Sequence, residues 1–218
     1  MKTIRTPARS RAAFTLTEVL ISGCLMASLM LVAGLATERT MDLFRQRRAA
    51  DAVAASTNRL LQRVTGELKF ARQASLLPAA PFPEGLSSLS FQKCLGVQGG
   101  AVAWSSRFNL AWELETGEVE DGVDNNGNGL IDEGQLVWTQ NEGQADEQRV
   151  VWAHGLCALL PGETLDNTDE DGDGLIDERG LCFSMDADVL TISIGLQGLG
   201  PDGNRITRVL ETSVLLRN

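Results

Sequence analysis

The chain has 218 residues, of which 43% are hydrophobic and 22% are charged, a composition ordinary for a folded domain with one additional element. Its formal net charge of −10 argues against nucleic acid as a partner, because phosphate binding requires clustered lysines and arginines. The four cysteines form no C-x-x-C pair, so neither a zinc ribbon nor a thioredoxin-like redox site is expected.

The N-terminal segment combines a basic leader, residues 1–13, with an apolar run. No charged side chain occurs over residues 19–36, a length of helix that crosses most of the hydrocarbon of a bilayer. The run is too long for a secretory signal peptide and has no A-x-A site. A plain membrane anchor with its basic flank in the cytoplasm fits, but it leaves Glu18 unexplained, because a carboxylate beside an apolar run is costly unless it is paired.

Residues 14–18 read F-T-L-T-E and stand directly between the basic leader and the apolar run. This arrangement resembles the signature of type IV prepilins. The resemblance implies that prepilin peptidase cuts after Ala13 and that Phe14 becomes the N-methylated first residue. It also implies that Glu18 pairs with the N-terminal amine of a neighbouring subunit in a filament. Two positions depart from the family pattern: Ala13 replaces the commoner glycine, and Thr17 stands where isoleucine or leucine is usual.

A second helical segment is predicted over residues 37–77, as an amphipathic continuation of the apolar helix 14–36. Its apolar residues are spaced mostly three, four or seven apart, which is the period of one helix face. They are Met41, Leu43, Phe44, Ala49, Val53, Leu60, Leu61, Val64, Leu68 and Phe70. This stripe is expected to pack on a sheet, with the intervening arginines in solvent. The prolines of L-L-P-A-A-P-F-P predict the end of the helix near residues 76–78.

Residues 78–218 are predicted to form a β-rich globular head. The candidate strands cover residues 89–92, 101–104, 107–115, 135–139, 149–154, 181–185, 189–196 and about 206–216. The segment G-L-G-P-D-G-N, residues 198–204, predicts a hairpin between the last two strands. The predicted fold class is therefore α+β: a long N-terminal helix packed on a mainly antiparallel sheet.

Two acidic segments of the head, residues 121–135 and 166–180, form a near-repeat at an offset of 45 residues and share the sequence G-L-I-D-E. Oxygen-bearing side chains at alternate positions, followed by glycine, resemble the front half of an EF-hand calcium loop. The alternative is that such segments are only polar turns, which are common. Two copies in one register favour calcium instead, with one ion in each segment.

The candidate ligands follow from this register. Alternate side chains would point inward, and Gly129 and Gly174 would permit the sharp turn. The candidates are Asp124, Asn126, Asn128, the carbonyl of Leu130 and Asp132 in one segment, and Asp169, Asp171, Asp173, the carbonyl of Leu175 and Asp177 in the other. Ile131 and Ile176 are expected to plug the segments. The second segment, which is richer in aspartate, is expected to bind more tightly.

Closure of the coordination differs from an EF-hand, because Gln135 and Gly180 stand where a bidentate glutamate is required. The candidates left open are Glu133 and Glu178, or the upstream Asp121 and Asp166. The flanks predict strands and loops instead of a helix pair, as in dockerin-like or thrombospondin-type repeats.

Cys157 and Cys182 bracket the second segment, and a disulfide between them would clamp its base. In an exported head such a bond is possible, although three head cysteines allow three pairings.

No catalytic activity is predicted. G-x-S-x-G, H-E-x-x-H and phosphate-loop spacings are absent from the sequence, and the single histidine, His154, lies in an apolar stretch. The prepilin resemblance implies a structural subunit, a minor pilin or a pseudopilin (the J-type among them), of a type IV pilus or type II secretion-type filament. Its partners would be other such subunits, prepilin peptidase and the inner membrane, with the head on the periplasmic or extracellular side. The alternative is a membrane-anchored, calcium-dependent adhesin or binding module that joins no filament.

Overall fold

The computed structural model describes residues 15–80 and 82–216 of the chain, so the predicted cleavage-site residues Ala13 and Phe14 lie outside the described part. The chain divides into two compact units, Met1–Phe44 and Arg45–Asn218. One helix, α1 (Leu16–Leu68), contributes to both units.

In the first unit the described residues are helical from Leu16 onward, and every side chain is exposed to solvent. Large apolar side chains here are more than half exposed, with Leu16 at 83% and Met30 at 69%. Leucine, methionine and alanine favour helix without packing partners, which explains why this segment is helical although nothing covers it. By length and composition the helix is able to span a membrane, and the structure describes one such helix.

In the second unit α1 buries one face. Thr57, Leu60, Leu61, Val64 and Leu68 are buried, at the three- and four-residue spacing of a single helix stripe. The predicted packing of this stripe against strands is therefore confirmed. In contrast, Met41, Leu43, Phe44 and Phe70 from the predicted stripe are all more than half exposed.

The helix ends at Leu68, so the predicted end at residues 76–78 is wrong. The backbone after Leu68 pairs with a strand: Cys94 donates its amide to the Phe70 carbonyl at 2.9 Å, and Leu77 exchanges two hydrogen bonds with Ser90. Only a short 3-10 turn, Gln73–Ser75, interrupts this pairing. Competition from strand pairing thus ends the helix before the prolines are reached.

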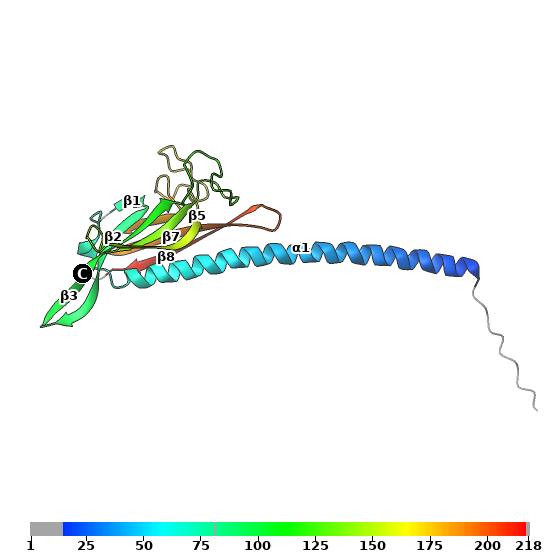
Figure 1. The fold of residues 1–218 in the computed structure, drawn as a ribbon, viewed down its shortest axis with the longest axis horizontal. Helices are drawn as coiled ribbons and strands as arrows, with labels where there is room; N and C mark the ends of the chain where they lie inside the picture. The colour runs from blue at the N-terminus through cyan, green and yellow to red at the C-terminus, as the bar shows by residue number, and fades with distance from the viewer. Residues whose placement is uncertain (1–14, 81, 217–218) are drawn as a thin grey trace, which may run out of the picture. The chain divides into compact units, whose positions relative to one another are not determined.

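The strands form one sheet in which every paired strand is antiparallel, as the α+β prediction requires. The strands are β1 (Phe82–Leu86), β2 (Ser88–Gln98), β3 (Ala101–Leu114), β4 (Gly134–Gln140), β5 (Gln148–Leu156), β6 (Leu181–Asp186), β7 (Val189–Leu199) and β8 (Arg205–Leu215). Their order is β1-β6-β7-β5-β4-β3-β2, and β8 pairs with β7 through the predicted hairpin (Figure 1).

Two features of the sheet differ from the prediction. β1 is not predicted, and the two predicted strands 101–104 and 107–115 are one strand, β3. The polar residues between them, Ser105 and Ser106, stand opposite the single residue Lys93 of β2, which donates its amide to the Ser105 hydroxyl at 2.9 Å. A bulge therefore replaces the expected chain break.

The core lies between the buried stripe of α1 and the sheet, and it includes Leu110, Leu136, Phe183 and Ile192. A row of aromatic rings crosses four neighbouring strands, with centroids 5.9 Å apart for Phe91–Phe108, 5.4 Å for Phe108–Trp138 and 5.7 Å for Trp138–Trp152. Such pairs add to the burial of apolar area and fix the register of β2 to β5.

Candidate metal centre

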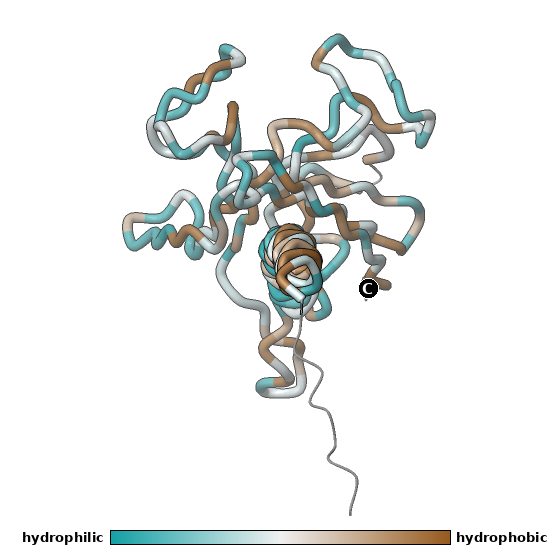
Figure 2. The backbone as a smooth tube through the Cα atoms, turned by 90° about the vertical axis from the view of Figure 1, so that its right-hand side faces the viewer, coloured by the Kyte–Doolittle hydropathy of each residue, from teal (hydrophilic) through white to brown (hydrophobic). Residues whose placement is uncertain are grey.

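Both acidic segments emerge from the same end of the sheet. The first loop, residues 117–133, connects β3 to β4, and the second loop, residues 162–178, connects β5 to β6. Leu114 pairs with Gly134, and Gly134 pairs with Leu156, so the strand ends that carry the loops are neighbours. Both loops rise beyond the strand ends in Figure 1, and in Figure 2 the loops between strands are drawn largely in hydrophilic teal.

The two loops have the same backbone conformation. Gly129 and Gly174, the glycines predicted to permit the sharp turn, have φ values of 89° and 93°. The remaining residues with positive φ in the two loops also occur in pairs, 45 residues apart. These pairs are Gly117 and Gly162, Gly122 and Asn167, Gly127 and Gly172, and Asp132 and Asp177. This region of φ suits glycine and, less well, asparagine and aspartate. The two loops therefore repeat each other in backbone conformation as well as in sequence.

Asp124 and Asp169, the first predicted ligands, hold the tight turn together. Asp124 accepts hydrogen bonds from the amides of Gly127 at 2.6 Å and Gly129 at 2.8 Å. Asp169 accepts the equivalent bonds from Gly172 and Gly174, at 2.6 and 2.9 Å. The carboxylate at this position therefore holds the turn through two backbone amides in each loop.

The next two predicted ligands in each loop form turns with the backbone two residues ahead. In the second loop, Asp171 Oδ1 accepts the amide of Asp173 at 3.0 Å, and Asp173 Oδ1 accepts that of Leu175 at 2.8 Å. Asn126 and Asn128 make the same turns in the first loop, at 3.0 and 2.8 Å. In aspartate this leaves the second carboxylate oxygen for another partner.

The carboxylates of Asp132 and Asp177 serve the loop entrance. Asp132 accepts the amides of Asp121 and Gly122 at 3.1 and 2.8 Å, and Asp177 accepts those of Asp166 and Asn167. The two upstream aspartates in turn cap the residue two ahead: Asp121 accepts the amide of Val123 and Asp166 that of Thr168, each at 3.0 Å. Of the two open alternatives for closing the coordination, the buried Glu133 and Glu178 are therefore better placed than Asp121 and Asp166, which are exposed.

The expected plug by isoleucine is wrong in the second loop, where Ile176 is 43% exposed and Leu175 is half-buried. In the first loop Ile131 is half-buried, but Leu130, at 7% exposed, is the more buried of the two. Leu130 packs toward Gly155, where a Cβ would stand 3.4 Å from the leucine Cδ1.

Sequence reasoning missed one acidic position in each loop, Glu118 and Glu163. Both are 8% exposed and lie six residues before the first predicted ligand of the loop, Asp124 or Asp169. Glu118 Oε1 accepts the amide of Asn126 at 2.8 Å, and Glu163 Oε2 accepts the amide of Asp177 at 3.2 Å. The signal was present, because the dipeptide Gly-Glu recurs at 117–118 and 162–163 at the same offset of 45 residues.

The second loop concentrates unneutralised carboxylates. Oxygens of Glu163, Asp169 and Asp171 lie within 4.8 Å of one another, the one such group in the part of the chain that the structure describes. Glu163 Oε1 and Glu178 Oε2 are buried without a hydrogen-bond partner among the described residues. Burial, together with the charges of Asp173 and Glu163, raises the pKa of Glu178 to about 7. Carboxylate oxygens gathered in this way suit a hard divalent cation such as Ca²⁺.

Arg179 connects the two loops. It follows Glu178 directly, and its guanidinium donates to Glu120 of the first loop at 2.5 Å. The same guanidinium stacks over the Trp112 ring, 4.7 Å from its centroid. The residue that corresponds to Arg179 after the first loop is Gly134, where a Cβ would stand 2.1 Å from Trp112 Nε1. Only one of the two loops can carry a side chain here, because the indole fills the other position.

Cys157 and Cys182 are both buried free thiols in the structure, so it gives no support to a disulfide at the base of the second loop. Burial raises the pKa of Cys157 to about 11 and that of Cys182 to about 12, and the Glu178 carboxylate adds to the second shift. Thiols with such pKa values are poor nucleophiles at neutral pH. Pairing of these cysteines stays a prediction.

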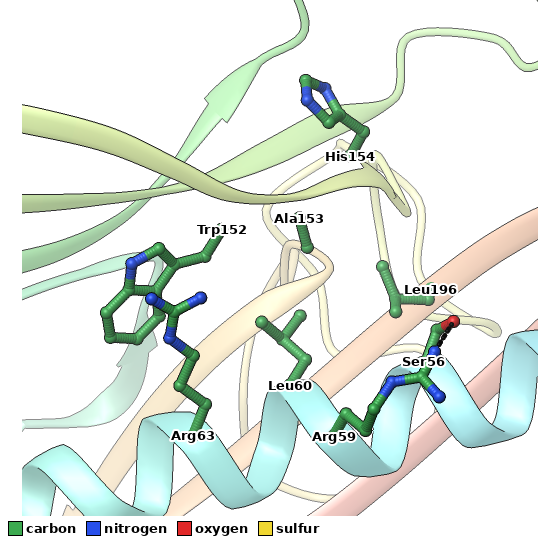
Figure 3. Close-up of a pocket in the computed structure, with 8 residues that line it drawn as sticks. All are labelled: Ser56, Arg59, Leu60, Arg63, Trp152, Ala153, His154 and Leu196. Carbon is green, nitrogen blue, oxygen red and sulfur yellow. Dashed lines mark hydrogen bonds between the residues drawn. The ribbon is translucent and has the colours of Figure 1, made fainter.

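Away from the two loops, a hollow of about 420 Å³ lies in the head between α1 and β5. Figure 3 shows Arg63 reaching from the helix toward the strand, with its guanidinium 3.9 Å from the centroid of the Trp152 ring, whereas Arg59 runs along the helix and donates to the Ser56 hydroxyl at 3.0 Å. His154 points away to the opposite side of β5, where its Nδ1 lies 3.0 Å from Glu115 Oε1. The hollow therefore offers cations and an indole, but no acid–base pair.

Comparisons of the chain with protein-family models, with curated proteins and with solved structures gave no match in any of the three.

Proposed function

We propose that the chain is a membrane-anchored structural subunit, a minor pilin or pseudopilin, of a filament of the type IV pilus or type II secretion kind. The observation that carries this proposal is one helix with two kinds of surface. Residues 19–36 expose only uncharged side chains behind Glu18, whereas residues 57–68 bury a stripe beneath the sheet. A subunit held by its helix needs both: an apolar surface to insert or assemble and a folded head to carry.

Glu18 is the residue to which the proposal assigns assembly. Its Oε2 accepts hydrogen bonds from the amide and the hydroxyl of Thr15, both at 2.9 Å, so the carboxylate is held close to the start of the helix. A carboxylate in apolar surroundings requires a cation. The N-terminal amine of a neighbouring subunit, created by cleavage after Ala13, would supply that cation.

Intact-mass measurement on the protein from its native membrane tests the processing. We expect a mature chain that begins with N-methyl-Phe14. Glu18→Ala should insert normally and fail to assemble, whereas Glu38→Ala, a matched change further along the same exposed helix, should assemble. An unprocessed N-terminus, together with normal assembly of Glu18→Ala, would instead favour the membrane-anchored binding module.

We also propose that the second loop binds Ca²⁺ and that the ion rigidifies the head on the export side of the membrane. The support is the pair of buried, unpartnered oxygens on Glu163 and Glu178, set beside Asp169, Asp171 and Asp173. Buried carboxylates without a cation cost several kcal/mol, and an ion that meets them removes that cost.

Calorimetric titration of the full-length chain in detergent tests this site directly. Millimolar Ca²⁺ should give binding heat and raise the melting temperature, whereas K⁺ at equal ionic strength should do neither. Glu178→Gln is expected to weaken binding without preventing folding, because it removes one charge from a crowded cluster. If wild-type protein shows neither heat nor a shift in melting temperature with millimolar Ca²⁺, the proposal of a calcium site is wrong.

A further inference from the structure

The interior of the first loop is closed by amide groups. Glu133 is fully buried, and its Oε1 accepts hydrogen bonds from Asn126 Nδ2 at 2.8 Å and from Asn128 Nδ2 at 2.6 Å. These two amides belong to the second and third predicted ligands and point their N–H groups at the carboxylate. A carboxylate that receives two N–H donors is stabilised in its charged form.

The second loop lacks these donors. Asp171 and Asp173 occupy the equivalent positions, and an ionised carboxylate has no hydrogen to donate. Their own backbone hydrogen bonds match those of the asparagines, so the difference is confined to the groups that face the interior. The second loop buries two unpartnered carboxylate oxygens, on Glu163 and Glu178, and the first buries one, on Glu133.

The first loop also satisfies its additional acidic residue better. Glu118 Oε1 accepts the amides of Asn125 and Asn126, at 3.2 and 2.8 Å. The equivalent Glu163 has one backbone donor, Asp177, at 3.2 Å, and its other oxygen is unpartnered. In the first loop the backbone amides and the two asparagine side chains thus donate to both buried glutamates, Glu118 and Glu133.

We propose that the first loop is an ion-free copy of the calcium loop, closed by Asn126 and Asn128, and that the chain binds a single Ca²⁺, in the second loop. This inference rests on the proposed calcium site and adds which of the two loops uses it. The two asparagines take the place of the ion, because they donate to Glu133 in the first loop. In the second loop the equivalent Glu178 has no such donors, and Ca²⁺ would neutralise it instead. The backbone template is common to both loops, and two side chains decide whether it needs a metal.

A reciprocal exchange tests the proposal on the full-length chain in detergent. Asn126→Asp with Asn128→Asp gives the first loop the interior of the second, and Asp171→Asn with Asp173→Asn does the reverse. Calorimetric titration with Ca²⁺ should give one ion per chain for wild type, two for the first double variant and none for the second. Two ions per wild-type chain with similar affinities would overturn the inference while leaving the calcium site intact.

Stability without calcium provides a second, independent readout. In a chelator, Asn128→Asp should lower the melting temperature by roughly 4–8 °C, because it replaces a donor to the buried Glu133 with a second negative charge. Asn125→Asp is the matched control: it adds the same charge to the same loop, at the position where the second loop has Glu170. Equal melting temperatures for the two variants would overturn the inference even if no loop binds calcium.

Discussion

The first and second loops have the same backbone conformation but different chemical groups inside. Their left-handed residues, their turn-forming aspartates and their entrance carboxylates agree position by position. Their interiors do not, because asparagine amides face Glu133 in one, and the charges of Asp173 and Glu163 act on Glu178 in the other. The comparison teaches that the residues that build such a loop and the residues that set the charge of its interior are separate sets.

The largest expected effect is on thermal stability when calcium is removed. At a hundredfold excess over its dissociation constant, Ca²⁺ stabilises a folded chain by about 2.7 kcal/mol, which corresponds to a rise in melting temperature of roughly 5–10 °C for a chain of this size. Differential scanning calorimetry in calcium and in chelator measures the difference. Asp171→Asn should abolish the calcium-dependent shift, whereas Asn126→Ala should lower the melting temperature equally in both conditions. A calcium response that follows the first loop instead would reverse the assignment.

The next effect concerns the glutamates that sequence reasoning missed. Glu163→Gln is expected to weaken Ca²⁺ binding about tenfold or more, close to 1.4 kcal/mol, because it removes one charge from the cluster with Asp169 and Asp171. Glu118→Gln keeps a carbonyl oxygen for the amides of Asn125 and Asn126 and should leave binding unchanged. Isothermal titration of both variants against wild type separates the two roles. Equal losses would show that both glutamates serve an ion.

The third effect is the pH dependence of stability and of calcium affinity. Burial raises the pKa of Glu178 to about 7, above its ordinary value, so without calcium this carboxyl destabilises the folded chain as the pH rises through 7 and ceases to do so toward pH 5. Calcium must displace that proton. Affinity should therefore fall by up to about tenfold per pH unit below 7 and stay level above it. Titrations between pH 5.5 and 8 measure this slope, and Glu178→Gln should flatten it. A wild-type profile without slope would contradict protonation at this residue.

The smallest effect concerns the connection between the loops. Arg179→Ala removes the ion pair with Glu120 and the stacking on Trp112, each worth about 0.5–1 kcal/mol. The melting temperature should fall by roughly 2–8 °C. Arg179→Lys keeps the charge but loses the planar stacking, and a double variant with Glu120→Ala separates the two contributions. If Glu120→Ala alone reproduces the full loss, stacking contributes nothing measurable.

Much of the fold could be predicted from sequence because it depends on local pattern. The apolar run, the helix stripe at Leu60, Leu61, Val64 and Leu68, and the alternating strands all follow from side-chain periodicity. The end of α1 could not be, because it is decided by pairing of Phe70 and Leu77 with a strand that comes later in the chain. Prolines mark where a helix cannot continue, and they do not show where a competing strand stops it sooner.

The candidate site divides in the same way. Ligand spacing and the turn glycines could be predicted because they lie within one continuous motif. Glu118 and Glu163 lie outside the EF-hand pattern, and only the folded loop brings them beside it. The unequal roles of the two loops depend on where the side-chain N–H groups of Asn126 and Asn128 point, and no spacing rule encodes that direction.

Trp112 lies at the junction of the two loops. Its ring occupies the space beside Gly134 where the first loop ends, stacks under Arg179 where the second ends, and donates its indole N–H to the Cys157 carbonyl at 3.0 Å. A single fluorophore therefore senses both loop exits at once. With the other three tryptophans replaced by phenylalanine, the emission of Trp112 would follow ion binding, loop opening and unfolding in real time, without any label attached to the chain.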